Sequence, residues 1–284
     1  MKILITGANG HIAQSFANYY DSCCKGETHL ISLRDESWRD ISFAGYDAVL
    51  HTAGLAHTRE TKRNQYDYYI INRDLTLEAA NKAKRDGVRQ FIFLSSISVY
   101  GITTGTITLD TPTTPKTHYG RSKLAAESML TALADDTFSV AILRPPMVYG
   151  PNCPGNFASF CRLVKKVPVF PDFENYRSMV YISNLCAYIQ AVIEMGHGGL
   201  FFPQDPAPIR TTEMALAIAK AQGKTLRLTR VFNGVINCFV SHANGASKMS
   251  KLFGSLVFDT SMPEIKNLDL VGFPDSVVKS VVHH

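Results

Sequence analysis

The sequence lacks several features that would define other classes of protein. No apolar run in its 284 residues approaches the roughly 20 residues that a membrane-spanning helix needs. The first residues, Met1–Thr6, are interrupted too soon for a signal peptide and are typical of a buried strand. Lysines and arginines are scattered, and the net charge of +5 is mild, so nothing indicates a nucleic-acid-binding face. We expect a cytoplasmic protein with no membrane span and no nucleic-acid partner.

The cysteines also lack a recognisable spacing. None of the six forms a Cys-x-x-Cys pair, which argues against a zinc ribbon or a redox dithiol. Without a secretory leader, free thiols in a reducing compartment are the simplest interpretation. We therefore expect neither a disulfide framework nor a metal site.

What the first half does contain is a regular alternation of short apolar runs with helical patterns. Ala13, Phe16, Ala17 and Tyr20 recur at spacings of three and four, which predicts one face of a helix. Strands are predicted over residues 2–6, 28–33, 47–52, 91–95 and 140–143, and further helices over 75–85 and 122–133. This alternation predicts an α/β fold of the Rossmann type, a doubly wound parallel sheet with helices on both faces.

The pattern becomes irregular after Arg144, where several prolines interrupt it. Helices are predicted over 184–195 and 212–222, and short strands over 200–202 and 226–231. We predict a nucleotide-binding domain of residues 1–150, rejoined by about 177–196. Residues 151–176 and 197–284 would form a smaller C-terminal substrate-binding domain.

A glycine-rich turn follows the first strand directly, as Thr6-Gly7-Ala8-Asn9-Gly10-His11-Ile12-Ala13. Glycines allow a tight turn and a close approach of main-chain N–H groups to an anion. The next helix then presents its positive N-terminal end to a pyrophosphate. Ala13 stands where the dinucleotide-binding pattern has its third small residue. The turn therefore predicts a site for NAD(P)(H).

The end of the second strand bears on the choice between the two coenzymes. An acidic residue there binds the ribose hydroxyls of NAD, whereas an arginine holds the 2′-phosphate of NADP. The sequence offers both, as Arg34-Asp35. Arg34 comes first and favours NADPH, although it could equally be a solvated loop residue.

Tyr119 and Lys123 are four residues apart at the start of a helical stretch, which places them on one helix face. A phenol with a pKa near 10 is a poor acid or base at neutral pH, and a neighbouring ammonium lowers that pKa. A serine after the fourth strand would lie at the carboxyl edge of the sheet, where α/β proteins bind ligands. These groups together predict proton transfer to or from a substrate oxygen.

These motifs resemble those of the extended short-chain dehydrogenases/reductases that act on nucleotide sugars. The resemblance rests on the glycine-rich turn, His51-Thr52-Ala53-Gly54, Asn72, the serine segment 95–101 and Tyr119-Gly120-Arg121-Ser122-Lys123. It implies Ser96, Tyr119 and Lys123 as the catalytic residues. It implies the following coenzyme-binding residues: Gly7, Asn9, Gly10, His11, Ile12, Arg34, Asp40, Ile41, His51, Ala53, Gly54, Asn72, Tyr119, Lys123, Pro146 and Val148.

The resemblance extends into the second half of the chain. The segments 144–151, 155–157 and 177–182 resemble those that pass the nicotinamide, meet the nucleotide and supply a diphosphate-binding arginine. A guanidinium suits bidentate contact with phosphate. The substrate-binding residues implied are Ser96, Ser98, Asn156 and Arg177. Members of the family often pair through the helix that carries Tyr119 and Lys123, so a homodimer is expected from the resemblance alone.

Three reactions share this set of residues: dehydration, epimerisation and ketone reduction. The family's dehydratases carry an Asp-Glu pair where this chain has Ile97 and Ser98, which argues against dehydration. Its 4-epimerases usually carry an asparagine where this chain has Met147, which argues against epimerisation. The segments 144–150, 153–157, 177–178 and 203–205 resemble capsule-locus reductases, such as the staphylococcal ones that make UDP-N-acetyl-D-fucosamine.

That resemblance implies reduction of the C4 ketone of a UDP-linked 2-acetamido-2,6-dideoxy-4-hexulose. Two alternatives stay open at this point. One is an NAD-dependent UDP-hexose 4-epimerase, which would retain its coenzyme through the reaction. The other is a regulator that senses NAD(P) without catalysis, since a fold alone does not imply a function.

Overall fold

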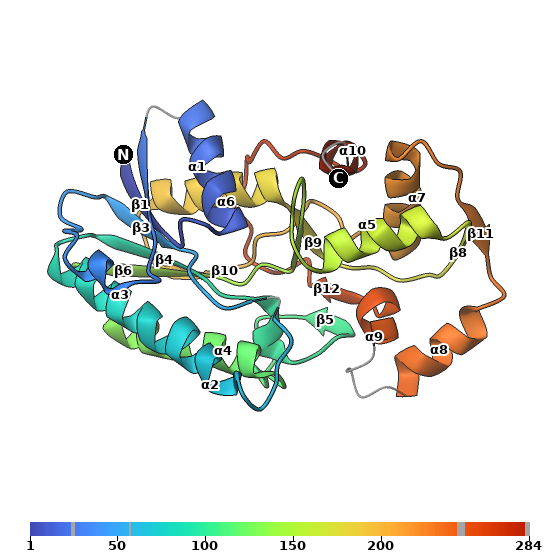
Figure 1. Cartoon of the computed structure of the whole chain (residues 1–284), viewed down its shortest axis with the longest axis horizontal. Coiled ribbons are helices and arrows are strands. Elements are labelled where there is room, and N and C mark those ends of the chain that lie inside the picture. The colour runs from blue at the N-terminus through green and yellow to red at the C-terminus, as the bar shows by residue number, and fades with distance from the viewer. Residues whose placement is uncertain (24–25, 57, 243–247, 282–284) are drawn as a thin grey trace.

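A six-stranded parallel sheet forms the centre of the molecule. The computed structural model describes residues 1–23, 26–56, 58–242 and 248–281. The strands follow the order β2, β1, β3, β4, β6, β10 across the sheet (Figure 1). They are β1 (Lys2–Thr6), β2 (Glu27–Ile31), β3 (Ala48–His51), β4 (Gln90–Leu94), β6 (Ser139–Leu143) and β10 (Gly199–Phe201). All neighbouring pairs are parallel, which confirms the predicted Rossmann-type fold.

Helices cover both faces of this sheet (Figure 1). On one face lie α1 (His11–Cys23) and α6 (Ile182–Met195), which pack on each other and on the side chains of Ile3, Ile5 and Leu50. On the other face lie α3 (Leu75–Arg85) and α4 (His118–Leu133). Strands buried on both faces are expected to be largely apolar, as β4 is after its first residue, Gln90.

Two helices of the first half, α1 and α3, lie where the apolar pattern predicts them. The face of α1 made of Ala13, Phe16, Ala17 and Tyr20 is buried, and α3 begins and ends at the predicted residues. Helix α4 differs, because it begins at His118 rather than at residue 122. Its N-cap is Thr117, whose hydroxyl accepts a hydrogen bond from the Gly120 N–H at 3.0 Å. The earlier start places Tyr119 in the first helical turn.

The remaining elements surround the sheet and extend it at one end. The short pieces within the first half are η1 (Glu36–Arg39), α2 (Gln65–Tyr69), η2 (Ile70–Asp74), η3 (Ile97–Tyr100) and β5 (Gly105–Ile107). The later elements are β7 (Met147–Tyr149), α5 (Asn156–Lys166), β8 (Val169–Pro171), β9 (Met179–Tyr181), α7 (Thr211–Ala221), β11 (Arg227–Thr229), α8 (Asn233–His242), α9 (Lys248–Phe253), β12 (Leu256–Phe258) and α10 (Asp275–Val281). The parallel pairs β7–β9 and β8–β11 lie within these later elements, and a third pair, β5–β12, joins them to the first half.

One apolar core joins the second region to the sheet. The cluster that contains Ile5 and Leu50 of the sheet continues through Phe160 of α5 and Ile218 of α7. Strand β10 pairs with β6, so residues 199–201 belong to the main sheet. The predicted domain division placed them in the substrate-binding domain instead. In the described part of the chain, no helix combines the length and apolarity needed to cross a membrane.

The packing of β4 generates a stability prediction. The Ile92 side chain lies in the middle of β4 with 0% of its surface exposed, whereas Ile70 in η2 is 57% exposed. We expect Ile92→Ala to lower the free energy of unfolding by about 2–5 kcal/mol, since it removes buried methyl groups and leaves a cavity. Ile70→Ala is the matched control and should change it by less than about 0.5 kcal/mol. Urea unfolding followed by circular dichroism measures both, and equal effects would contradict the assigned core.

Candidate active site

The glycine-rich turn between β1 and α1 lies at the carboxyl edge of the sheet, at the point where the strand order reverses. From β1 the chain passes to β2 on one side and then to β3 on the other. Gly7 has a φ of +86°, and a Cβ on it would lie 2.8 Å from the main-chain nitrogen of Ala53. A Cβ on Gly10 would lie 3.0 Å from the Gly7 carbonyl oxygen. Only glycines fit here, and this tight cradle beside the N-terminus of α1 suits a dinucleotide phosphate.

The predicted residues of this turn lie along its open side. Asn9 and Gly10 are exposed, and His11 and Ile12 are half-buried in the first turn of α1. The His11 Nε2 atom lies 3.0 Å from the Sγ atom of Cys153, which comes from the segment between β7 and α5. Burial raises the pKa of the Cys153 thiol to about 12, so the sulfur stays protonated. The contact ties the cradle to the second region, and sequence reasoning did not predict it.

Arg34 and Asp35, which follow β2, are both exposed and differ in their hydrogen bonding. The Asp35 carboxylate caps η1 by accepting the Ser37 N–H at 3.0 Å, and this bonding lowers the Asp35 pKa. The Arg34 side chain is exposed beyond the strand end. Asp40 and Ile41, predicted near the adenine, are both exposed at the end of η1.

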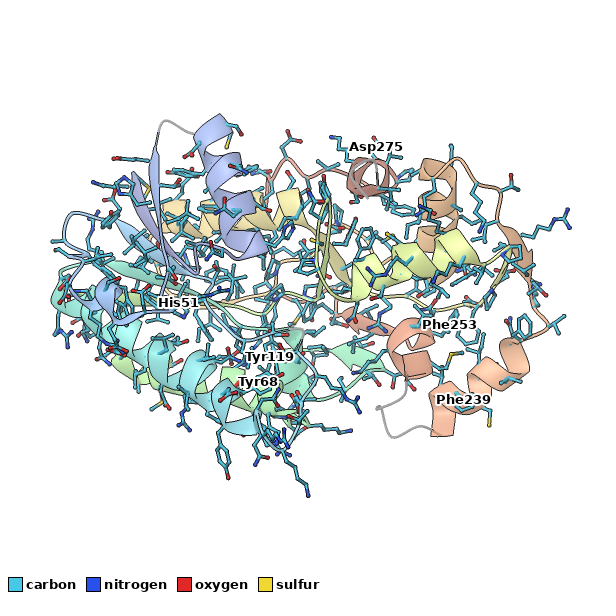
Figure 2. The ribbon with its side chains drawn as sticks, in the orientation of Figure 1. His51, Tyr68, Tyr119, Phe239, Phe253 and Asp275 are labelled. Carbon is cyan, nitrogen blue, oxygen red and sulfur yellow. The ribbon has the colours of Figure 1, made fainter. Side chains whose placement is uncertain are left out.

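Ser96 follows β4, and Tyr119 and Lys123 lie on the neighbouring helix α4. Figure 2 shows Tyr119 near Tyr68, whose ring centre lies 6.4 Å from that of Tyr119. Ser96 follows β4 and caps η3, where its Oγ accepts the Ser98 N–H at 3.1 Å. A hydrogen bond joins the Ser96 and Tyr119 side chains. The Lys123 ammonium donates to the Leu94 carbonyl oxygen at 2.7 Å.

The ionisation of these groups follows from their burial. Burial raises the pKa of Tyr119, and the hydrogen bond from Ser96 opposes this rise only in part. Burial lowers the pKa of Lys123 to about 7, opposed by the negative charge of Glu127. The phenol is therefore protonated at neutral pH, and the amine is close to its midpoint.

Asn72 holds the loop after β3 against helix α4. Its side chain is fully buried, accepts the Leu55 N–H at 2.7 Å and donates to the Ser122 hydroxyl at 3.1 Å. A Cβ on Gly54 would lie 3.0 Å from the Asn72 Oδ1 atom and 3.3 Å from the Lys123 ammonium. Gly54, Asn72 and Lys123, each predicted to bind the coenzyme, thus lie close together.

His51 is placed differently from the expectation that it lines a coenzyme. Its imidazole is fully buried, with its two nitrogens 2.9 Å and 3.0 Å from the hydroxyls of Thr6 and Thr76. Burial lowers its pKa to about 3, so the ring is neutral. The side chain therefore belongs to the core. The sequence could not show this, because a histidine at a strand end gives the same pattern whether its side chain points into the core or toward the coenzyme. Ala53, two residues on, lies against Gly7.

The predicted residues of the second half lie at separate places around the edge. Pro146 is buried and Val148 half-buried in β7, next to a segment whose Pro145 carbonyl accepts the Ile97 N–H at 3.0 Å. Asn156 is exposed at the start of α5. Arg177 donates to the Gly254 carbonyl at 2.5 Å, and burial lowers its pKa to about 10.

Two acidic residues that sequence reasoning did not single out also hold the site. The Glu60 carboxylate accepts the main-chain N–H groups of His118 at 3.1 Å and Tyr119 at 2.9 Å, and so stabilises the start of α4. Glu127 pairs with Arg144 at 2.6 Å inside the protein. The position of Glu127, four residues after Lys123, indicates that the two side chains share a helix face. No local pattern in the sequence indicates that Arg144 is its partner.

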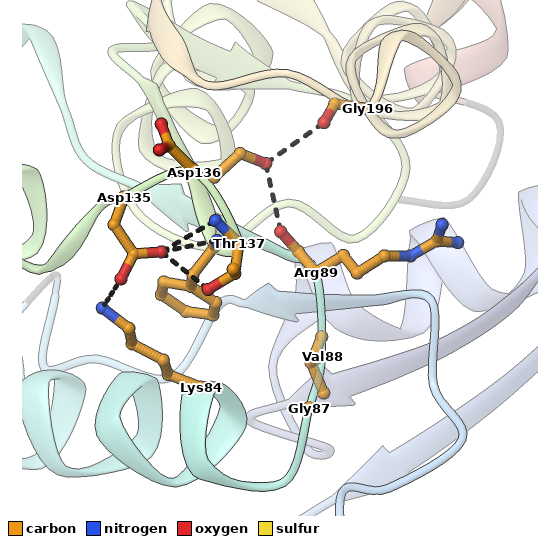
Figure 3. Close-up of a pocket in the computed structure, with 10 residues that line it drawn as sticks. Lys84, Gly87, Val88, Arg89, Asp135, Asp136, Thr137 and Gly196 are labelled. Atoms are coloured by element: carbon orange, nitrogen blue, oxygen red, sulfur yellow. Dashed lines mark hydrogen bonds and ion pairs between the residues drawn. The ribbon is translucent and has the colours of Figure 1, made fainter.

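A cavity of about 540 Å³ lies elsewhere, at the opposite edge of the sheet (Figure 3). Its lining includes Lys84, Arg89, Asp135 and Ser139, which lie around the amino-terminal ends of β4 and β6. None of the predicted site residues reaches it.

A parallel sheet with a glycine cradle at its reversal point defines the class of dinucleotide-binding α/β proteins. Residues 3–201 match the family described as NAD dependent epimerase/dehydratase family. The chain belongs to this family, whose members are NAD(P)-dependent enzymes acting on nucleotide sugars.

Relatives and solved structures agree with this assignment. The chain is 36% identical over 189 residues to a UDP-glucose 4-epimerase of Vibrio cholerae, covering 62% of this chain and 57% of that protein. It is 30% identical over 168 residues to the N-acetyl-α-D-glucosaminyl-diphospho-ditrans,octacis-undecaprenol 4-epimerase of Escherichia coli O157:H7, covering 57% and 50%. The chain thus spans only about half of these relatives.

Two solved structures share the fold over nearly the whole chain. A dTDP-4-dehydrorhamnose reductase of Clostridium acetobutylicum has a TM-score of 0.75 at 18% identity, covering 99% of both chains. A UDP-glucuronic acid 4-epimerase of Bacillus cereus, solved with NAD, has a TM-score of 0.74 at 19% identity, covering 100% and 96%. At these identities the likeness concerns the fold alone.

The cradle geometry predicts the effect of adding one methyl group. Gly7→Ala should weaken binding of NADPH and NADH by at least about tenfold, or ~1.4 kcal/mol, because the new Cβ has no room against Ala53. Gly45→Ala is the matched control, since Gly45 has a φ of +81° but no atom lies within 4 Å of where its new Cβ would stand. Titration calorimetry measures both. Equal losses would point to backbone strain in general and contradict the cradle.

Proposed function

We propose that the protein reduces the C4 ketone of a UDP-linked 2-acetamido-2,6-dideoxy-4-hexulose with NAD(P)H. The product would be UDP-N-acetylfucosamine or its C4 epimer, a precursor for capsule or other polysaccharide. The observation that supports reduction is the pairing of Ser96 with Tyr119 at the carboxyl edge, where Tyr119 is a protonated phenol whose pKa burial raises further. A ketoreductase begins with a proton donor beside the substrate oxygen, and a protonated phenol is that donor.

The reaction adds a hydride to the carbonyl carbon and a proton to its oxygen. A bound reduced nicotinamide supplies the hydride. Tyr119 gives its proton to the developing alkoxide, and Ser96 donates a hydrogen bond to the same oxygen. The charged form of Lys123 favours the phenolate that Tyr119 leaves behind, which lowers the cost of the proton transfer.

The residues that would hold the coenzyme are those of the cradle: Gly7, Asn9, Gly10, His11 and Ile12. Between the two coenzymes we favour NADPH. The Asp35 carboxylate is already occupied in capping η1, whereas Arg34 is exposed and able to meet a 2′-phosphate.

The substrate would lie between Ser98 and the second region. Asn156 at the start of α5 and Arg177 before β9 are the proposed contacts for the nucleotide diphosphate. Dehydration is disfavoured, because Ile97 and Ser98 cannot supply the additional acid and base that loss of water requires.

A 4-epimerase is the second candidate. It is favoured by the identity of 36% to a UDP-glucose 4-epimerase, and both candidates use the same Tyr119 and Lys123 chemistry. An epimerase must first remove a proton from the sugar hydroxyl, so it requires the phenolate form of Tyr119 at the start. A pure coenzyme sensor would have no need of the assembled Ser96, Tyr119 and Lys123.

The assay that separates the two candidates follows coenzyme absorbance. When a UDP-4-keto-6-deoxy-N-acetylhexosamine is generated in situ, we expect one NADPH to be oxidised for each sugar reduced. NADH should react more slowly if Arg34 binds the 2′-phosphate. Absence of oxidation, with conversion of UDP-glucose or UDP-N-acetylglucosamine to its C4 epimer, would replace the reductase by the epimerase.

The role of Tyr119 is tested by removing one oxygen. Tyr119→Phe should lower kcat by a factor of about 10²–10⁴, because the proton donor is lost, while NADPH affinity stays near wild type. Tyr66→Phe is the control, since Tyr66 is 68% exposed on α2. Full turnover by Tyr119→Phe would rule out the catalytic assignment.

A further inference from the structure

Glu127 is an acidic side chain buried beside the active site, with only 4% of the residue exposed. Its carboxylate accepts hydrogen bonds from the Arg144 guanidinium, at 3.1 Å from Nε and 2.6 Å from the terminal nitrogen. It also accepts a short hydrogen bond from the Ser95 hydroxyl. The other terminal nitrogen of Arg144 donates to the Tyr100 hydroxyl at 2.9 Å, and the guanidinium lies 5.0 Å from the centre of that ring.

These partners come from the separate elements that build the site. Ser95 follows β4 and precedes Ser96 in the chain. Arg144 follows β6 and leads into Pro145 and Pro146. Glu127 itself lies one helical turn after Lys123 on α4, so the two side chains share a helix face. One carboxylate therefore connects two strand ends with the helix that carries Tyr119 and Lys123.

We propose that Glu127 is a positioning residue of the reaction: it fixes the ends of β4 and β6 against α4 and keeps its negative charge one helical turn from Lys123. The inference rests on the proposed function for its effect on turnover. A buried ion pair is not in itself a source of stability, since desolvation offsets much of its attraction. Its bonds from α4 to the ends of two strands, through Ser95 and Arg144, are what point to positioning.

The charge of Glu127 acts on Lys123 in a known direction. Burial lowers the Lys123 pKa to about 7, and Glu127 opposes this lowering. The other titratable groups near the amine are Tyr119 on the same helix, neutral His51 on β3, and Arg144, which Glu127 itself partners. Loss of the carboxylate therefore lowers the Lys123 pKa further, and the ammonium is lost at a lower pH.

The first test is the pH dependence of kcat/KM for Glu127→Gln, with NADPH and the 4-keto sugar. Activity that needs the ammonium is lost as the pH rises through the Lys123 pKa. This loss forms the alkaline limb of the pH profile. We expect the limb to move to lower pH by about one unit in the variant, which is a normal size for the loss of a nearby opposite charge. Asp135→Asn is the control, because it neutralises the Lys84–Asp135 ion pair at the other edge of the sheet (Figure 3). Its limb should not move.

A second pair of variants separates charge from structure. Ser95→Ala removes one hydrogen bond and keeps the carboxylate, so turnover should fall while the limb stays in place. Glu127→Gln combined with Arg144→Gln removes both buried charges, which avoids a lone buried cation and preserves folding. The limb of this double variant should again move down. An equal shift in Ser95→Ala, or no shift in either Glu127 variant, would overturn the proposal.

A direct titration makes the result independent of the reaction. The ¹³Cε resonance of Lys123, assigned by its absence in Lys123→Met, reports the protonation of the amine without any substrate. We expect its midpoint to fall by about one pH unit in Glu127→Gln. A lower midpoint in a protein that fails to oxidise NADPH would support the role of Glu127 and refute the reductase. An unchanged midpoint would refute the role of Glu127 itself.

Discussion

The parallel pairing of the sheet is the constraint on which the rest of the structure depends. Every main-chain hydrogen bond between β1 and β3, and between β4 and β6, requires the strands to run the same way. Their carboxyl ends therefore meet at a single edge, and each connection must return across a helical face. The glycine cradle, Ser96 and the Arg144 segment reach one place only because they follow strands in that register.

Helix α4 brings Tyr119 and Lys123 to this edge. Its start is held by Thr117 and by the Glu60 carboxylate, and its middle by Asn72, which reaches Ser122. The Lys123 ammonium bonds to the last carbonyl of β4. These contacts are polar, and those of Asn72 and Lys123 are buried, so they fix the position of the helix. Burial at this position raises the pKa of Tyr119 further above neutral pH.

Much of this was predictable from the sequence, and the exceptions have physical reasons. Local periodicity revealed α1 and α3, and a spacing of four residues placed Tyr119 and Lys123 on one face. The start of α4 was missed because Thr117 caps it without an apolar pattern behind it. The pairing of Glu127 with Arg144 joins residues 17 apart through the fold, and no local pattern encodes such a contact. The sequence could not predict that His51 is buried in the core, because both faces of β3 are covered and its residues show no alternation between apolar and polar.

The second region was the least predictable part, and its packing has an evolutionary consequence. Its helices α5 and α7 contribute to the same apolar cluster as the sheet, with no boundary between two cores. A segment that shares its core with the coenzyme-binding half cannot be exchanged as a module without exposing that half. Substituting side chains on a second region that stays in place is therefore the change of specificity that this packing tolerates best.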